Sequence, residues 1–216
     1  MTEGSWLTEQ TAPPTLHDFG GFPQALFDVR YPAPGLPDLA RTVVDLLGEE
    51  VGAGLSSSWG LDHGAWCVLR HMHPDARVPV VQLSLDALQS PSWHLAQGRR
   101  LTILREQGVL ILGSGNLVHN LARVRWQDNA PPYSWAVEAD EWLAARIQAR
   151  DYAALCDFDR FPESVRMAIP TPEHYLPLLY VLGAMRDDDT VDFPIQGMDL
   201  GSISMRSCLC QRAATR

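Results

Sequence analysis

The chain has 216 residues, of which 46% are hydrophobic and 20% are charged, a composition typical of a globular protein with one sizeable core. Its formal net charge is −9, from 26 acidic and 17 basic residues. An acidic surface repels phosphate groups, so nucleic acid and anionic membranes are not expected as partners. No apolar stretch reaches the roughly 20 residues of a membrane helix, and the N-terminus lacks the features of a signal peptide, so we expect a cytoplasmic protein.

Proline and glycine punctuate residues 12–37, which predicts a long irregular segment of the kind that is more often functional than idle. Beyond it the hydrophobic spacing predicts helices at 38–50, 65–72, 91–107, 136–149 and 174–182, and strands at 78–85, 109–112, 191–195 and 202–209. Apolar strands that alternate with helices indicate an α/β fold. We expect a single domain, residues 1–216, around a mainly parallel central sheet with helices on both faces. In such sheets ligands gather at the carboxyl ends of strands, which points to the residues after Leu112.

Four cysteines are present, and only Cys208 and Cys210 lie close together in sequence, as a C-x-C pair. Disulfides are rare in the cytosol, and C-x-C alone is a weak indication of a metal site. In a strand the two side chains would point to the same face, and we interpret them as core or surface residues without chemistry.

The motifs of serine hydrolases, nucleotide-binding loops and H-E-x-x-H metalloproteases are absent, which leaves histidine as a base or metal ligand. His119 follows the apolar run 109–112 in a Gly-Ser-Gly-Asn loop, where backbone can approach a ligand closely. The alternative for His119 is a histidine that caps the next helix.

His174 lies beside Glu173, and the preceding Thr171 and Pro172 predict a helix start with Thr171 as N-cap. An imidazole beside a carboxylate is a candidate metal ligand, and a structural role is equally compatible with the spacing. The remaining histidines carry less information. His63 lies in a turn and His17 in the proline- and glycine-rich loop, where a functional and a structural role are equally open; we expect His71, His73 and His94 to be surface residues.

Six segments of the chain, taken in order, resemble the class III extradiol dioxygenases, and most closely the 4,5-DOPA dioxygenase group with its catalytic subunit of the B type. The segments are residues 14–23, which contain His17-Asp18-Phe19-Gly20-Gly21, and residues 31–35, 60–64, 79–84, 113–121 and 171–178. Together they extend over nearly the entire chain.

The resemblance implies a non-haem metal enzyme that opens the ring of a catechol such as DOPA beside its two hydroxyls, with O₂ as the other substrate. It implies iron(II) as the metal for dioxygenase activity, with zinc able to occupy the same site. His174 is then expected to be a metal ligand, and His119 an acid/base residue that also serves as a ligand. His63 is expected to be catalytic and to line the substrate pocket, and His17 to help hold the substrate.

Members of this family begin with a strand that ends in H-G-S-P and a second that ends in S-A-H-W, each with a metal-binding histidine. By this resemblance Met1 falls just after the second motif, so we expect an N-terminally truncated catalytic domain whose first strands are missing. An iron(II) oxygenase needs about three protein ligands. The alternatives are therefore a ring-cleaving dioxygenase and a catalytically inactive remnant that serves as a binding or interaction protein. Metal-assisted hydrolysis by the same histidines is a third hypothesis.

Overall fold

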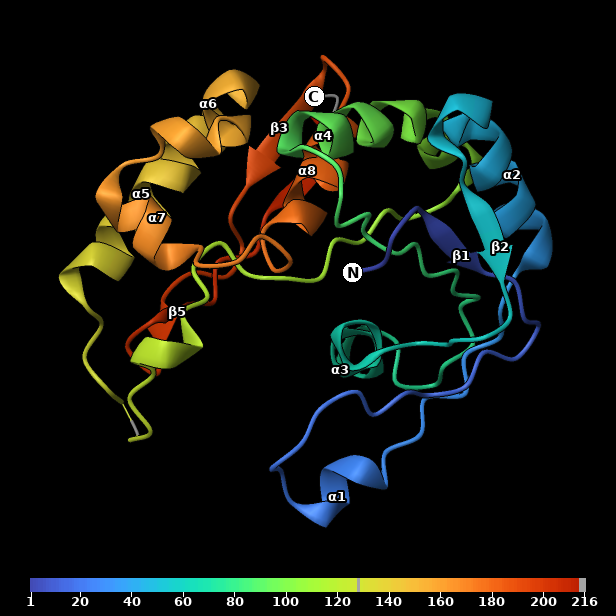
Figure 1. Ribbon diagram of the computed structural model, residues 1–216, viewed down its shortest axis with the longest axis horizontal. Helices are drawn as coiled ribbons and strands as arrows, with labels where there is room; N and C mark the ends of the chain where they lie inside the picture. The colour runs from blue at the N-terminus through green and yellow to red at the C-terminus, as the bar shows by residue number, and fades with distance from the viewer. Residues whose placement is uncertain (128, 214–216) are drawn as a thin grey trace. The chain divides into compact units, whose positions relative to one another are not determined.

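A computed structural model of the chain describes residues 1–127 and 129–213. The chain falls into two compact units, Met1–Leu88 and a second that begins at Gln89, and each is considered by itself. Figure 1 labels their helices and strands. Among the described residues, no helix is long and apolar enough to cross a membrane.

Short strands, helices and long irregular segments make up the first unit. Its elements are β1 (Trp6–Thr8), α1 (Gln24–Phe27), α2 (Pro37–Leu47), η1 (Glu49–Val51), β2 (Gly54–Ser56) and α3 (His63–Met72). Strands β1 and β2 pair in parallel, with Leu7 opposite Leu55 (Figure 1). The strand predicted at 78–85 is extended and joined to the N-terminal segment by backbone hydrogen bonds, but only isolated bridges form there.

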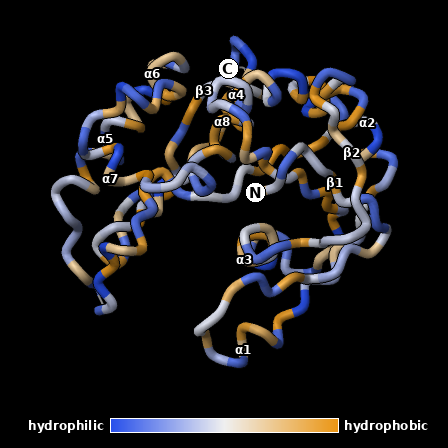
Figure 2. The backbone as a smooth tube through the Cα atoms, viewed as in Figure 1, coloured by the Kyte–Doolittle hydropathy of each residue, from blue (hydrophilic) through white to orange (hydrophobic). Residues whose placement is uncertain are grey.

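Local sequence explains the two longer helices of this unit. In α2 the buried residues Ala40, Val43 and Leu47 follow helical spacing, which Figure 2 shows as alternating hydrophobic and hydrophilic colour along the tube. Helix α3 begins after Asp62, whose carboxylate accepts a hydrogen bond of 3.0 Å from the Ala65 N–H, an ordinary N-cap. Both helices confirm the sequence prediction.

A compact core holds α3 in place. Trp66 is fully buried, and its indole N–H donates to the carbonyl of Leu16 at 2.7 Å. Tyr31, Leu61 and Leu69 complete the centre of this cluster, against which Phe19 packs. The irregular segment 12–37 is therefore anchored to α3 by burial and by hydrogen bonds to its backbone.

Helices dominate the second unit. Its elements are α4 (Pro91–Arg100), η2 (Thr102–Gln107), η3 (Leu121–Arg123), α5 (Ser134–Gln148), α6 (Tyr152–Cys156), η4 (Phe158–Arg160), α7 (Glu163–Ala168), α8 (Leu176–Gly183), β3 (Asp189–Asp192), β4 (Met198–Asp199), β5 (Ile203–Ser204) and β6 (Leu209–Arg212). Strand β3 pairs with β6 and β4 with β5, both antiparallel. The helix predicted at 91–107 is divided at Leu101, where α4 gives way to the 3-10 helix η2.

Helices α4 and α8 pack closely because Gly98 and Gly183 carry no side chain at their crossing. A Cβ on Gly98 would overlap the carbonyl oxygen of Tyr180, and one on Gly183 that of Leu95. Between the helices lies His94, which is fully buried, with Nδ1 at 3.3 Å from the Tyr180 hydroxyl. The prediction that His94 is a surface residue is wrong, because α4 turns this face toward α8.

The mixed helix-and-strand architecture is confirmed, and the details of the strands differ from expectation. Residues 109–112 form no regular strand. The two late strands are shifted: the first is β3, and the second is divided into β5 and β6. The described residues contain three two-stranded sheets, of which β1–β2 is parallel. A mainly parallel central sheet stays a prediction.

Candidate active site

The loop that carries His119 is held by backbone hydrogen bonds on both sides. The His119 N–H donates to the carbonyl of Ala168, at the end of α7, at 2.9 Å. On the other side the Ser204 N–H of β5 donates to the Val118 carbonyl at 2.9 Å, and His119 forms an isolated bridge with Ile203. Because α7 and β5 fix its backbone, His119 has a defined position although it belongs to no helix or strand.

His174 lies in the turn that precedes α8. The Asn116 N–H donates to the His174 carbonyl at 2.9 Å, and the Asn116 side-chain amide donates to the Ser204 carbonyl at 2.8 Å. Thr171 is not the N-cap that its sequence suggested, because α8 begins only at Leu176. Its hydroxyl donates instead to the Glu173 carboxylate at 2.6 Å. The loop of His119 and the turn of His174 are thus tied together through Asn116.

The two imidazoles meet face to face. Their ring centroids lie 3.5 Å apart, and the ring planes enclose an angle of 21°. The resemblance to the extradiol dioxygenases implies that His119 and His174 serve one metal. Their short separation is compatible with this, and their functional roles stay predictions.

Electrostatics keep His119 neutral. Burial, and next the neighbouring His174, lower the pKa of His119 to about 4, although the Glu173 carboxylate acts in the opposite direction. Burial raises the pKa of Glu173, but the hydrogen bonds from Thr171 and its own backbone, together with the two imidazoles, lower it overall. At neutral pH His119 therefore presents a lone pair rather than a positive charge, next to an ionised carboxylate.

His119 should titrate near pH 4 in the metal-free protein, well below the ordinary histidine value of 6.5. Between these values the unfolded chain binds a proton at this residue that the folded protein excludes. This group therefore lowers the free energy of unfolding as the pH falls from about 6.5 to about 4, and has no such effect at neutral pH. NMR titration of the imidazole C–H signals measures the midpoint; a midpoint near 6.5 would contradict the expectation.

At Gly115 the two segments approach each other closely. A Cβ there would overlap the backbone carbonyl oxygen of His174. We expect Gly115→Ala to lower the free energy of unfolding by about 1–3 kcal/mol and to displace His174 from His119. Thermal denaturation and NMR spectra of the imidazoles measure both effects. Gly20→Ala is the matched control, since a Cβ at Gly20 meets nothing within 4 Å; equal effects of the two substitutions would contradict the prediction.

The donor chemistry of the His119–His174 pair fits a divalent transition metal. Neutral imidazole nitrogens are common ligands of iron(II) and zinc. Two observations show that the pair is not a complete metal site. Within residues 1–127 and 129–213, no group of three or more His, Cys, Asp or Glu side chains could hold a metal. The lone pairs of stacked rings also run side by side, so binding by both requires one ring to turn. The pair by itself is therefore not a complete metal site, and the ligand roles of both residues stay predictions.

A second group of candidate residues lies in the first unit. The carboxylate of Asp18 contacts His63 Nδ1 at 2.8 Å and accepts a hydrogen bond from the His63 N–H at 3.1 Å. Phe19 stands edge-on to His63, with ring centroids 5.7 Å apart. Both His63 and Asp18 are about half exposed, at 45% and 46% of their side chains. Asp18 therefore orients an imidazole that solvent and small molecules can reach.

His17 has a more enclosed environment. Its Nε2 lies 3.0 Å from the carbonyl of Val29, and its ring contacts Phe19, Phe27 and Trp66 at centroid distances of 5.9, 6.1 and 5.6 Å. One nitrogen is thus committed to the backbone. Its substrate-binding role stays a prediction.

Sequence reasoning assigned no role to Asp18, although it is the partner of His63. The available signal was the pattern His17-Asp18, together with the rule that a catalytic imidazole needs a group that orients it. Nothing in the sequence indicated that Asp18 pairs with a histidine 45 residues away.

Comparison with known proteins identifies the family of the chain. Residues 3–202 match the family model described as the catalytic LigB subunit of aromatic ring-opening dioxygenase. The chain is 44% identical to "4,5-DOPA dioxygenase extradiol" of Escherichia coli K12 over 211 residues, which cover 96% of this chain and 77% of that protein. It is 34% identical to the protein of the same name from Beta vulgaris, over 89% of this chain and 72% of the relative.

A solved structure has a similar fold. The crystal structure of an uncharacterized protein from Escherichia coli K12 superposes with a TM-score of 0.81 at 38% sequence identity, and covers 95% of this chain and 80% of that one. The chain thus belongs to the family of the catalytic LigB subunit of aromatic ring-opening dioxygenase. It is a ring-opening dioxygenase of the extradiol type, and therefore an oxidoreductase that uses an aromatic small molecule and O₂.

Proposed function

We propose that this enzyme opens the ring of a catechol such as DOPA, and that its metal is a non-haem iron(II) held in part by His174 and His119. Zinc would occupy the same position without supporting the oxidation. The observation that carries the proposal is the stacked pair of imidazoles, in which His119 stays neutral beside the Glu173 carboxylate. The names of the relatives support the choice of substrate, since several are called 4,5-DOPA dioxygenase extradiol.

Iron in this position would supply electron-transfer and Lewis-acid chemistry to the bound substrates. The residues of the chain would bind and orient the catechol and move its protons. His119 is neutral at physiological pH, so its lone pair can coordinate the metal or accept the proton of a catechol hydroxyl. The carboxylate of Glu173 would stabilise the imidazolium that results.

His63 would provide the second proton-handling group. With its Nδ1–H directed at Asp18, Nε2 is left as an acceptor for a substrate hydroxyl. The aromatic edge of Phe19 supports the ring from the side. His17 would act on the substrate through the loop it anchors rather than through Nε2, which faces the Val29 carbonyl.

The test is oxygen uptake by the iron-loaded protein with DOPA and simpler catechols, together with metal analysis. We expect consumption of O₂ that depends on catechol and on iron(II), and that stops when zinc replaces iron. Binding of catechol without oxygen consumption would instead identify a binding protein that has kept the fold. Hydrolysis of an ester substrate without oxygen uptake would favour metal-assisted hydrolysis.

Asp18 offers a specific test of the role of His63. Asp18→Asn removes the charge that orients the imidazole, and we expect kcat to fall by about 10–100-fold while the melting temperature stays close to that of the wild type. Asp28→Asn is the matched control, because Asp28 is an exposed carboxylate of the same unit whose side chain contacts Gln24. Equal activity of Asp18→Asn and Asp28→Asn would remove His63 from the proposed mechanism.

We also propose that residues 1–216 form one catalytic domain around a mainly parallel sheet in a cytoplasmic enzyme. The match of the family model to residues 3–202 supports a single domain, because this range includes most of both compact units. A single cooperative unfolding transition, with the same midpoint for tryptophan fluorescence and circular dichroism, is the expected result. Two separate transitions would contradict it.

A further inference from the structure

The thiols of Cys208 and Cys210 face each other at the start of β6. Their Sγ atoms lie 3.8 Å apart, and both residues are free cysteines with intermediate exposure. Cys210 lies opposite Val191 in the antiparallel pair of β6 and β3. The spacing in sequence places both side chains on one face, as expected for alternate positions of an extended chain. The two sulfur atoms would have to approach each other by less than the length of a disulfide bond, about 2 Å, to become bonded.

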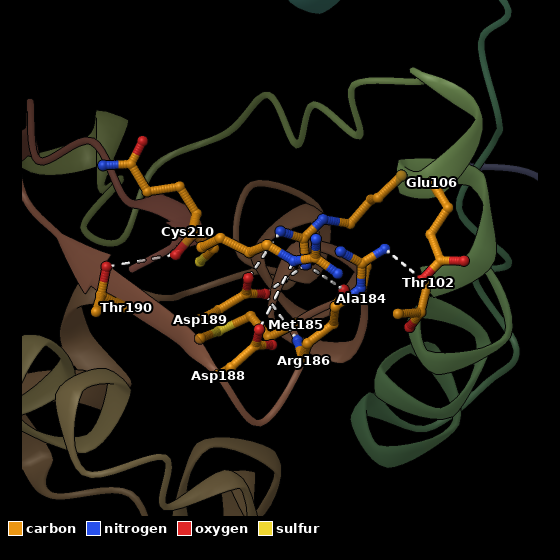
Figure 3. Close-up of polar contacts among 12 residues, drawn as sticks. Thr102, Glu106, Ala184, Met185, Arg186, Asp188, Asp189, Thr190 and Cys210 are labelled. Atoms are coloured by element: carbon orange, nitrogen blue, oxygen red, sulfur yellow. Dashed lines mark hydrogen bonds and ion pairs between the residues drawn. The ribbon is translucent and has the colours of Figure 1, made fainter. Parts of the chain in front are cut away.

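Charged groups converge on Cys210 from several elements. Arg105 of η2 and Asp189 of β3 form an ion pair, and Figure 3 shows Cys210 beside Asp189. Arg105, Asp189 and also Arg150, in the turn after α5, act electrostatically on Cys210. Tyr152 of α6 is a further titratable neighbour; burial and Cys210 raise its pKa, although Arg150 opposes them. Two guanidinium groups that favour the thiolate therefore act on Cys210 together with one carboxylate that opposes it.

The two thiols are unequal in this environment. The contact with the Cys208 thiol lowers the pKa of the Cys210 thiol, as do the two guanidinium groups, although burial and Asp189 oppose them. The pKa of Cys208 is raised far above its usual range by that same contact and by burial. Burial also raises the pKa of the other two cysteines, Cys67 and Cys156. Cys210 is thus the thiol of this chain best suited to react as a thiolate.

We propose that Cys208 and Cys210 form a peroxide-reactive dithiol, with Cys210 as the nucleophile and Cys208 as the resolving thiol. In the first step Cys210 sulfur attacks one oxygen of hydrogen peroxide, the O–O bond breaks, and the other oxygen leaves as water after it takes a proton. Sulfur is oxidised by two electrons to the sulfenic acid and the peroxide is reduced. Cys208 sulfur then attacks Cys210 sulfur, the S–O bond breaks, and a second water leaves as the disulfide forms.

The position of the two cysteines makes the disulfide easy to reduce. A disulfide between residues that are two apart closes a very small ring, and strain of this kind makes the bond easy to reduce. The intermediate exposure of both residues gives small oxidants and reductants access. This site depends on neither the metal nor the proposed substrate, so its test is separate from theirs.

The experiment treats the reduced 216-residue protein with hydrogen peroxide. We expect the number of titratable thiols to fall from four to two, the mass to drop by two hydrogen atoms, and peptide mapping to join Cys208 to Cys210. Dithiothreitol should restore all four thiols. Protein with both Cys67→Ser and Cys156→Ser should form the same disulfide at the wild-type rate. A disulfide that involves Cys67 or Cys156, or no loss of thiols, would overturn the proposal.

Two single variants test the order of the steps. Cys208→Ser removes the resolving thiol, so peroxide should leave a sulfenic acid on Cys210 that dimedone traps. Cys210→Ser removes the nucleophile, and the remaining thiols should react at least about 10-fold more slowly, as neutral thiols do. Dimedone capture at Cys208 in Cys210→Ser, at the rate seen for Cys210, would overturn the assignment of roles.

Discussion

Replacing His119 with glutamine is expected to reduce kcat/KM for ring cleavage by about 10²–10⁴-fold in the iron-loaded enzyme. This corresponds to a loss of about 3–5 kcal/mol of transition-state stabilisation. Glutamine preserves the size and a hydrogen-bonding group, but it can neither accept a proton nor serve as an imidazole ligand. The backbone contacts of residue 119 with Ala168 and β5 do not involve the side chain, so the fold should persist. Oxygen uptake with DOPA measures the effect.

Metal content separates the two roles proposed for His119. If the imidazole is a ligand, the His119→Gln protein should also bind iron(II) and zinc more weakly; if it serves only as acid/base, metal affinity should stay unchanged while kcat falls. His71→Gln is the matched control, because His71 is an exposed histidine near the end of α3. Retention of wild-type activity by His119→Gln would show that the stacked pair is not part of the active site.

Asp189→Ala should lower the free energy of unfolding by about 3–5 kcal/mol, more than Gly115→Ala does. The side chain of Asp189 is fully buried, with both carboxylate oxygens bonded to Arg105 and one to the Arg186 N–H at 2.7 Å. Figure 3 shows Asp189 and Arg186 within this network of polar contacts. Alanine would leave the largely buried guanidinium of Arg105 without its counter-ion. Denaturation by urea at pH 7 measures the loss.

The pH dependence of stability provides a second measure of Asp189. Burial raises the pKa of its carboxyl, but the hydrogen bond from Arg105 and the other contacts lower it overall, below the ordinary value of 3.8. Asp189 therefore makes its full contribution to the free energy of unfolding at pH values above the pKa of the unfolded chain. This contribution is lost as the pH falls through the lower pKa of the folded protein. Asp192→Ala is the control, since Asp192 is an exposed carboxylate on the same strand. Comparable destabilisation by both variants would contradict the buried ion pair as its cause.

The helices were largely predictable because their determinants are local. Apolar spacing located α2, and an aspartate N-cap with two buried residues explains α3. Strands were less predictable, since a strand is completed only by a partner. Residues 109–112 are as apolar as a buried strand, yet among the described residues no other segment pairs with them as a strand.

The sequence by itself determined the family, the segments that carry the histidines, and the candidate status of His119 and His174. Only the tertiary structure decided which side chains meet. It stacks His119 on His174, joins Asp18 to His63, buries His94 against Tyr180, and places Cys210 beside the Arg105–Asp189 pair. The physical reason is that periodicity and capping act over a few residues, whereas these contacts join residues far apart along the chain. Such contacts depend on how the intervening helices pack, and packing is a property of the whole core rather than of any local pattern.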